Sequence, residues 1–222
     1  MTDHDPVVST LRTMLTDERS QLLDAVLRKR LHGLTVLLED VHTPQNMSAC
    51  IRTLESYGIQ NVHVVELRDP FVISRKTTQG CHKWMDIHRH ATTQDAITTL
   101  RENGYRLVVS SLEATQTLDD FDFSIPTALC FGNEKDGISQ ELLGVVDDRF
   151  RIPMHGFSQS LNLSVALAIS IHEASNARKA RLGVETDLTS EQAQDLYERW
   201  SRLGIKDSDR IVEALSSRKN DP

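Results

Sequence analysis

Short apolar segments typical of buried strands alternate along this chain with longer segments of helical periodicity. Strands are predicted at Leu34–Leu38, Val62–Val65, Arg106–Ser110, Thr127–Phe131 and Arg149–Ile152. Helices are predicted at Met47–Tyr57, Thr93–Asn103, Ser139–Val145 and Leu163–Arg181, with an extended loop at Arg68–Trp84. This alternation predicts an α/β fold with a mostly parallel sheet and helices on both of its faces.

The two ends of the chain differ from this middle part. Residues 1–33 are a predicted N-terminal helical extension with one helix over Pro6–Arg30, and residues 34–183 form the α/β domain. Residues 184–222 are a polar C-terminal extension with predicted helices at Ser190–Leu203 and Asp207–Leu215. Neither a signal peptide nor a membrane-spanning run is predicted, so we expect a cytoplasmic protein without membrane contact.

Charge and cysteine content exclude several classes of protein. The net charge of −7 argues against a protein that coats nucleic acid without selectivity, although local basic clusters can still contact phosphates. The three cysteines, Cys50, Cys81 and Cys130, are widely spaced and form no CxxC pair, which argues against disulfides and zinc. No cysteine or carboxylate completes a metal set around His88 and His90, so we interpret them as surface histidines and expect no metal.

Polar residues gather where predicted strands end. Glu39–Asn46 follows the first strand, Gly132–Gly137 follows the strand at Thr127–Phe131, and Gln159–Ser164 leads into the long helix. Because ligands of open parallel sheets bind at the carboxyl ends of strands, these segments predict a site. Taken singly, each has a structural interpretation: Asn46 as a helix N-cap, and the glycines as turn residues.

Motifs of several large enzyme classes are missing. No predicted strand is followed by GxGxxG, which argues against a dinucleotide-binding enzyme, and no GxxxxGK[ST] occurs. HExxH and GxSxG are also absent, which weakens the metalloprotease and hydrolase interpretations.

Three motifs follow one another along the chain at Asn46–Thr53, Phe131–Ile138 and Ile152–Ala166. Together they resemble the motifs of the SpoU/TrmH family of SPOUT-class methyltransferases. The segments Leu34–Asn46 and Cys81–Trp84 also resemble the branch of this family that methylates the ribose 2′-hydroxyl of a D-loop guanosine in tRNA. The resemblance implies S-adenosylmethionine as cofactor, tRNA as partner, and a deep trefoil knot in the C-terminal half of the core.

The resemblance also assigns roles to single residues. By motif position, the cofactor-binding residues are Ser110, Gly132, Ile152, Ser160 and Leu161. Glu134 and Asn162 are implied to hold the loops of the knot, and Arg52 is implied to be catalytic with Asn46 beside it. Since the pKa of an arginine lies above about 12, we favour stabilisation of the developing alkoxide over proton acceptance as the role of Arg52.

Partner contacts follow from the same resemblance. Phosphates of the RNA are expected to meet four basic residues, Lys29, Arg30, Lys83 and Arg178. Apolar residues lie on more than one face of the predicted helix Leu163–Arg181, so we expect this helix to pack on its own sheet and on a second subunit. A homodimer through the knot region and this helix is therefore expected.

The chain departs from the family pattern in regions that contact RNA. It has Leu31-His32-Gly33 where a Pro-Asp pair is usual, Ser158 where an aliphatic residue is common, and Asn176 where arginine is frequent. Ribosomal RNA, or another position in tRNA, thus stays a possible substrate, although the short segment ahead of the first strand favours tRNA. Two further hypotheses stay open, a non-catalytic RNA-binding protein and a SPOUT base methyltransferase.

Overall fold

The computed structural model describes residues 6–67, 72–205, 208 and 210. The chain divides into two compact units, each of which is described by itself. The larger unit is Leu31–Val184, and the smaller combines Met1–Arg30 with Glu185–Pro222. Both terminal extensions of the sequence analysis thus fall mainly in one unit.

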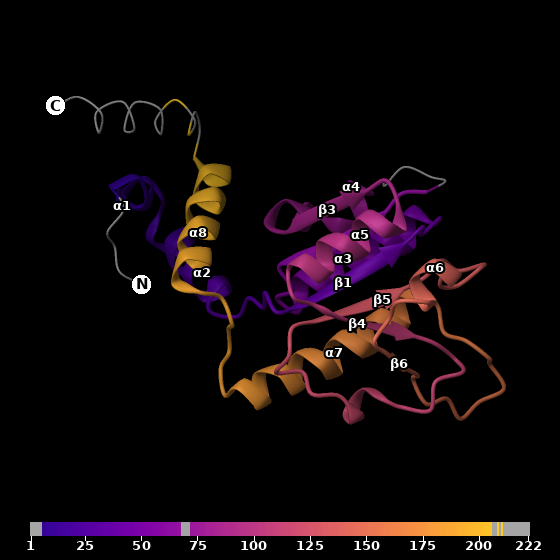
Figure 1. The fold of residues 1–222 in the computed structure, drawn as a ribbon. Coiled ribbons are helices and arrows are strands. Elements are labelled where there is room, and N and C mark those ends of the chain that lie inside the picture. Colours follow the sequence, from indigo (N-terminus) through magenta and orange to yellow (C-terminus); the bar gives the residue numbers. More distant parts are fainter. Residues whose placement is uncertain (1–5, 68–71, 206–207, 209, 211–222) are drawn as a thin grey trace. The chain divides into compact units, whose positions relative to one another are not determined.

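A six-stranded sheet with the order β3-β2-β1-β5-β4-β6 forms the centre of the larger unit (Figure 1). Its strands are β1 Leu34–Glu39, β2 Asn61–Val65, β3 Asp86–His90, β4 Arg106–Ser110, β5 Thr127–Phe131 and β6 Asp148–Phe150. All neighbouring strands pair in parallel. Every residue of β1, β2 and β5 is buried, as in a parallel sheet covered on both faces. The predicted α/β fold with a parallel sheet is confirmed.

Helices pack on the two faces of this sheet. On one face, Leu34, Val36 and Leu38 of β1 share a core with α3 (Pro44–Ser56) and α7 (Leu163–Leu182). On the other, Leu37 shares a second core with α5 (Thr93–Glu102) and α6 (Gln140–Leu143). Alternate residues of a strand point to opposite faces, so one apolar run serves both cores. The unit also contains the short helices α4 (Arg75–Thr78), η1 (Cys81–Trp84) and η2 (Leu118–Asp120).

The sequence analysis missed the edge strand β3. Its sequence, Asp-Ile-His-Arg-His, has one aliphatic residue and no apolar run. It is held by main-chain pairing with β2, in which Val64 lies opposite Arg89. The predicted loop at Arg68–Trp84 contains α4 and η1, and the strand predicted at Arg149–Ile152 begins and ends earlier, at Asp148 and Phe150.

Two helix starts also differ from the predictions. The single helix predicted over Pro6–Arg30 is broken, because the side chain of Thr16 accepts a hydrogen bond from the Arg19 N–H and begins a new helix there. Asn46 is not an N-cap: Thr43 holds the N-cap position and Pro44 is the first residue of α3. Asn46 therefore lies in the first turn of α3, where its side chain is available for other contacts.

In its described residues, the smaller unit contains α1 (Pro6–Met14), α2 (Asp17–Leu27) and α8 (Ser190–Gly204). Helix α8 contacts both other helices and buries Tyr197 and Trp200, and the Tyr197 hydroxyl lies 3.0 Å from that of Ser20 in α2. The helix predicted at residues 207–215 falls almost entirely outside the described residues. Among the residues that the structure describes, no helix is long and apolar enough to cross a membrane.

Candidate active site

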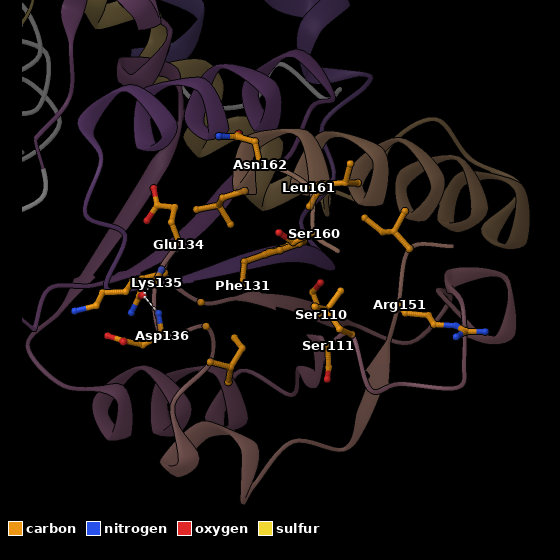
Figure 2. A pocket seen from close by; sticks show the side chains of 18 of the residues that line it. Ser110, Ser111, Phe131, Glu134, Lys135, Asp136, Arg151, Ser160, Leu161 and Asn162 are labelled. Atoms are coloured by element: carbon orange, nitrogen blue, oxygen red, sulfur yellow. Dashed lines mark hydrogen bonds between the residues drawn. The ribbon is translucent and has the colours of Figure 1, made fainter. Parts of the chain in front are cut away.

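A pocket of about 570 Å³ opens at the carboxyl ends of β4 and β5, next to the segment that follows β6 (Figure 2). It contains all five residues expected to bind the cofactor, Ser110, Gly132, Ile152, Ser160 and Leu161. Glu134 and Asn162 line it as well. Residues far apart in the sequence therefore meet in one cavity, at the edge of the sheet where ligands of such folds bind.

The loop after β5 forms one wall of the pocket and is closed on itself. Asn133 and Gly137 exchange two main-chain hydrogen bonds, of 3.2 and 3.1 Å. The Asn133 side-chain oxygen accepts from the main-chain N–H groups of Lys135 and Asp136. A Cβ on Gly132 would lie 2.0 Å from the Gly137 carbonyl oxygen, so no other residue fits there without displacing main chain. Gly137 itself has φ +70°, which favours glycine.

A chain of side-chain hydrogen bonds joins the three motif segments. The Asn46 amide N–H donates to Glu134 Oε1 over 2.6 Å, and the Asn46 amide oxygen accepts from the Asn162 amide over 3.1 Å. The Asn162 oxygen in turn accepts from the main-chain N–H and the hydroxyl of Ser164, so Asn162 is the N-cap of α7. Helix α3, the loop after β5 and the start of α7 are therefore connected beside the pocket.

Glu134 is the acceptor at one end of this chain. Partial burial by itself would raise the pKa of Glu134, but hydrogen bonds from the Asn46 side chain, its own main-chain N–H, Thr43 and His42 outweigh that effect. The pKa of Glu134 therefore lies below its ordinary value. The carboxylate stays ionised at neutral pH and lies near the N-terminus of α3, where a negative charge is favourable.

The structure does not bring Arg52 to this pocket. Arg52 lies on α3, six residues after Asn46, with an exposed side chain. Its guanidinium donates to the Thr77 carbonyl oxygen over 3.4 Å, and it is not among the residues that line the cavity. The predicted catalytic role of Arg52 is therefore not supported by a contact with the pocket of a single chain, and it stays a prediction.

Two of the four basic residues expected to contact RNA are buried. The Arg30 side chain has no exposed surface, and its guanidinium carbon lies 5.0 Å from the Trp200 ring centroid. Arg178 is 5% exposed and donates to the carbonyl oxygens of residues 123–125 over 2.7–3.3 Å. Both serve the packing of the fold, so the expectation that they meet phosphates is corrected. Lys29 and Lys83 are exposed, as a phosphate contact requires.

Three histidines stack at the edge of the sheet, on β2 and β3. The His63 ring lies between those of His88 and His90, with centroids 4.6 and 5.2 Å away, and its Nδ1 lies 3.0 Å from His90 Nε2. His88 is exposed, as the sequence analysis expected, whereas His63 is 3% exposed. Burial, followed by the neighbouring charges of His88 and His90, lowers the pKa of His63 to about 3. Among the described residues, no group of three or more His, Cys, Asp or Glu side chains is arranged to hold a metal ion.

The sequence analysis missed several residues that line the pocket. Ser111 and Leu112 follow Ser110 directly, and Arg151 precedes Ile152. Figure 2 shows Ser110, Ser111 and Arg151 towards one end of the pocket and Glu134, Lys135 and Asp136 towards the other. Ser111, Leu112 and Arg151 could have been predicted from their place beside Ser110 and Ile152. A loop that continues from a strand end lies over the same edge of the sheet as the strand end itself.

Comparison with known proteins assigns the family. Residues 33–172 match the profile of the SpoU rRNA Methylase family. The chain belongs to this family. A relative from Thermus thermophilus, named tRNA (guanosine(18)-2′-O)-methyltransferase, is 38% identical over 189 residues, which are 84% of this chain and 97% of the relative.

Solved structures agree with this assignment. The TrmH/SpoU tRNA modifying enzyme of A. aeolicus superposes with a TM-score of 0.76 at 29% identity, over 86% of this chain and 98% of that protein. An AdoMet-bound rRNA methyltransferase from Sinorhizobium meliloti has a TM-score of 0.59 at 33% identity, over 68% of this chain and 59% of that protein. The likeness in fold and the family profile therefore support the same assignment.

Proposed function

We propose that this protein transfers the methyl group of S-adenosylmethionine to the ribose 2′-hydroxyl of guanosine 18 in the D-loop of tRNA. The observation that carries the proposal is the pocket: three motif segments meet there, and Asn46 connects them. The name of the Thermus thermophilus relative, which matches over nearly its whole length, supports this substrate. A tRNA substrate also agrees with a cytoplasmic enzyme.

The residues of the pocket fit S-adenosylmethionine. A cavity of about 570 Å³ is within the usual range for a ligand of this size, and its lining combines apolar groups with a few polar ones. Gly132 has no side chain to cover its own main chain, and a side chain at this position would collide with Gly137. Ser110, Gly132, Ile152, Ser160 and Leu161 would hold the cofactor, which when bound supplies an electrophilic methyl group on a sulfonium.

The residues of this chain must then align a ribose hydroxyl and favour loss of its proton. Alignment alone can lower the barrier by about 7–11 kcal/mol. Ser160 and Asn162, which line the pocket, can orient the ribose by hydrogen bonds, and Asn162 is connected through Asn46 to the ionised Glu134. Arg52 would stabilise the developing alkoxide or grip the adjacent phosphate, since positioned charge is commonly the largest catalytic term.

We also propose that the enzyme is a homodimer with a trefoil knot. Helix α7 supports the dimer, because it is buried against α3 and β1 on one side yet leaves Val165 46% exposed on another. Leu161 and Phe157, in the segment ahead of α7, are exposed as well. A second subunit covering this surface would remove apolar area from water and could bring the partner's copy of Arg52 to the pocket. The knot is proposed from family membership.

A methylation assay with a matched RNA pair tests the proposal. The full chain is incubated with methyl-labelled S-adenosylmethionine and a tRNA that carries guanosine or 2′-deoxyguanosine at position 18. We expect label in the first RNA, resistance of the bond after nucleotide 18 to alkali, and no label in the second. Label in the deoxy RNA would show transfer to an atom other than this 2′-oxygen. Label in ribosomal RNA, supplied in a parallel reaction, without label in the tRNA would refute the tRNA substrate.

A further inference from the structure

Glu39, the last residue of β1, is a buried carboxylate that does not line the pocket. It is 2% exposed. Its Oε1 accepts hydrogen bonds from the hydroxyls of Thr93 and Ser139, over 2.7 and 2.6 Å, and its Oε2 accepts from the Ser139 main-chain N–H over 2.8 Å. A carboxylate is costly to bury unless such donors satisfy it, so this arrangement is specific for an acceptor.

The hydrogen of the Ser139 hydroxyl is committed to Glu39. The same oxygen accepts from the Leu142 N–H over 3.2 Å as the N-cap of α6, so the hydroxyl donates in one direction and accepts from the other. A glutamine in place of Glu39 keeps the shape but brings a donor, which would face one of the three existing donors. The site therefore distinguishes a carboxylate from its isosteric amide.

Ser139 ends the segment that forms one wall of the pocket. Gly137 and Ile138, the two residues before it, line the cavity, and the Gly137 carbonyl packs against Gly132. The N-terminal end of this segment is fixed by pairing of β5 with β1, where Phe131 lies opposite Leu38. The C-terminal end, at Ser139, is fixed to the same strand by Glu39. Both ends of the loop are thus held to β1.

We infer that Glu39 is a positioning residue for the methyl-donor site: through Ser139 it sets where Gly137 and Ile138 lie relative to the cofactor. This inference rests on the proposed function, because it takes S-adenosylmethionine as the ligand of the pocket. Thr93, the other donor to Glu39, is the first residue of α5 and does not line the pocket, so it provides an internal control.

Calorimetric titration of S-adenosylmethionine into the full chain, without RNA, tests the inference. We expect Glu39→Gln to weaken binding about tenfold or more, since a hydrogen bond to a charged group is replaced by facing donors. Ser139→Ala should weaken binding in the same direction, and Thr93→Val should bind close to the wild type. In the methylation assay, Glu39→Gln should raise KM for the cofactor and leave kcat at saturating cofactor near that of the wild type.

Leu100→Ala, in the apolar core between α5 and the sheet, controls for general destabilisation. At a temperature where all variants are folded, it should bind the cofactor as the wild type does. Wild-type affinity for the cofactor in Glu39→Gln would overturn this inference and leave the proposed function intact. Equal weakening of cofactor binding in Thr93→Val and Ser139→Ala would do the same. If Glu39→Gln does not fold, the comparison of Ser139→Ala with Thr93→Val decides. No binding by the wild-type chain would overturn the proposed function as well.

Discussion

Lowering the pH from 8 to 5 should destabilise the larger unit by about 2 kcal/mol through His63 alone. Burial first, and then the charges of His88 and His90, lower the pKa of His63 from 6.5 to about 3 in the folded chain. Between these two values the unfolded chain binds a proton that the folded chain does not. Stability is therefore complete above pH 6.5 and is lost as the pH falls towards 3, by about 1.4 kcal/mol per pH unit.

His88 and His90 act in the same direction, because burial lowers the pKa of each. The variant His63→Phe removes the buried titration and keeps a ring between the other two. It should lose about 1 kcal/mol at pH 8, for the hydrogen bond to His90, and show a shallower loss of stability between pH 8 and pH 5. Keeping the pH at or above 5 leaves the carboxylates of Glu134 and Asp147 ionised, since hydrogen bonds outweigh burial and lower the pKa of both.

Urea unfolding followed by tryptophan fluorescence measures this effect. The sequence has two tryptophans, and Trp200 belongs to the smaller unit, so Trp200→Phe leaves Trp84 as the reporter of the larger unit. Leu54→Ala, a cavity variant in α3, should lower the free energy of unfolding by about 2–5 kcal/mol at every pH and keep the wild-type pH dependence. Equal pH dependence in His63→Phe and the wild type would refute the assignment of a buried, uncharged His63.

Three further predictions follow from the site. Gly132→Ala should abolish cofactor binding in a calorimetric titration, because its Cβ would lie 2.0 Å from main chain, whereas Gly156→Ala, with no atom within 4 Å, should bind normally. Arg178→Met should lower thermal stability by the equivalent of about 3 kcal/mol, by leaving buried carbonyls without their donor, and should not change the salt dependence of tRNA binding. Arg52→Ala should lower kcat about a hundredfold or more in the methylation assay and leave cofactor affinity unchanged; full activity would refute its catalytic role.

The strands of the fold could be predicted where they are buried on both faces. Strands β1 and β5 are mostly apolar, because a covered parallel sheet has no solvent side. Strand β3 could not be predicted this way, since it lies at the edge and its sequence is mostly polar. Its pairing depends on the main chain of β2, which an amino-acid pattern does not encode.

The environment of single charged side chains was harder to predict than the pocket. All five residues that motif position predicts for cofactor binding line the pocket: Ser110 and Gly132 lie at strand ends, and Ser160 and Leu161 lie just before α7. Arg178 stands in a basic cluster that is typical of a solvent-exposed helix end. Its burial depends on a turn more than fifty residues earlier, where the carbonyl oxygens of residues 123–125 have no strand partner and accept from its guanidinium. Burial of this kind is a property of tertiary packing.

Asn46 shows how the three motifs depend on one another. Its side chain donates to Glu134 and accepts from Asn162, because an amide has a donor and an acceptor on separate atoms at its end. An aspartate there would face the Glu134 carboxylate at hydrogen-bond distance, and an alanine would leave Glu134 and Asn162 without their common partner. Because Asn162 also caps α7 and Glu134 belongs to the loop after β5, one amide couples the geometry of three segments. Each motif residue is therefore required by the other two, which single-residue interpretations such as helix capping could not reveal.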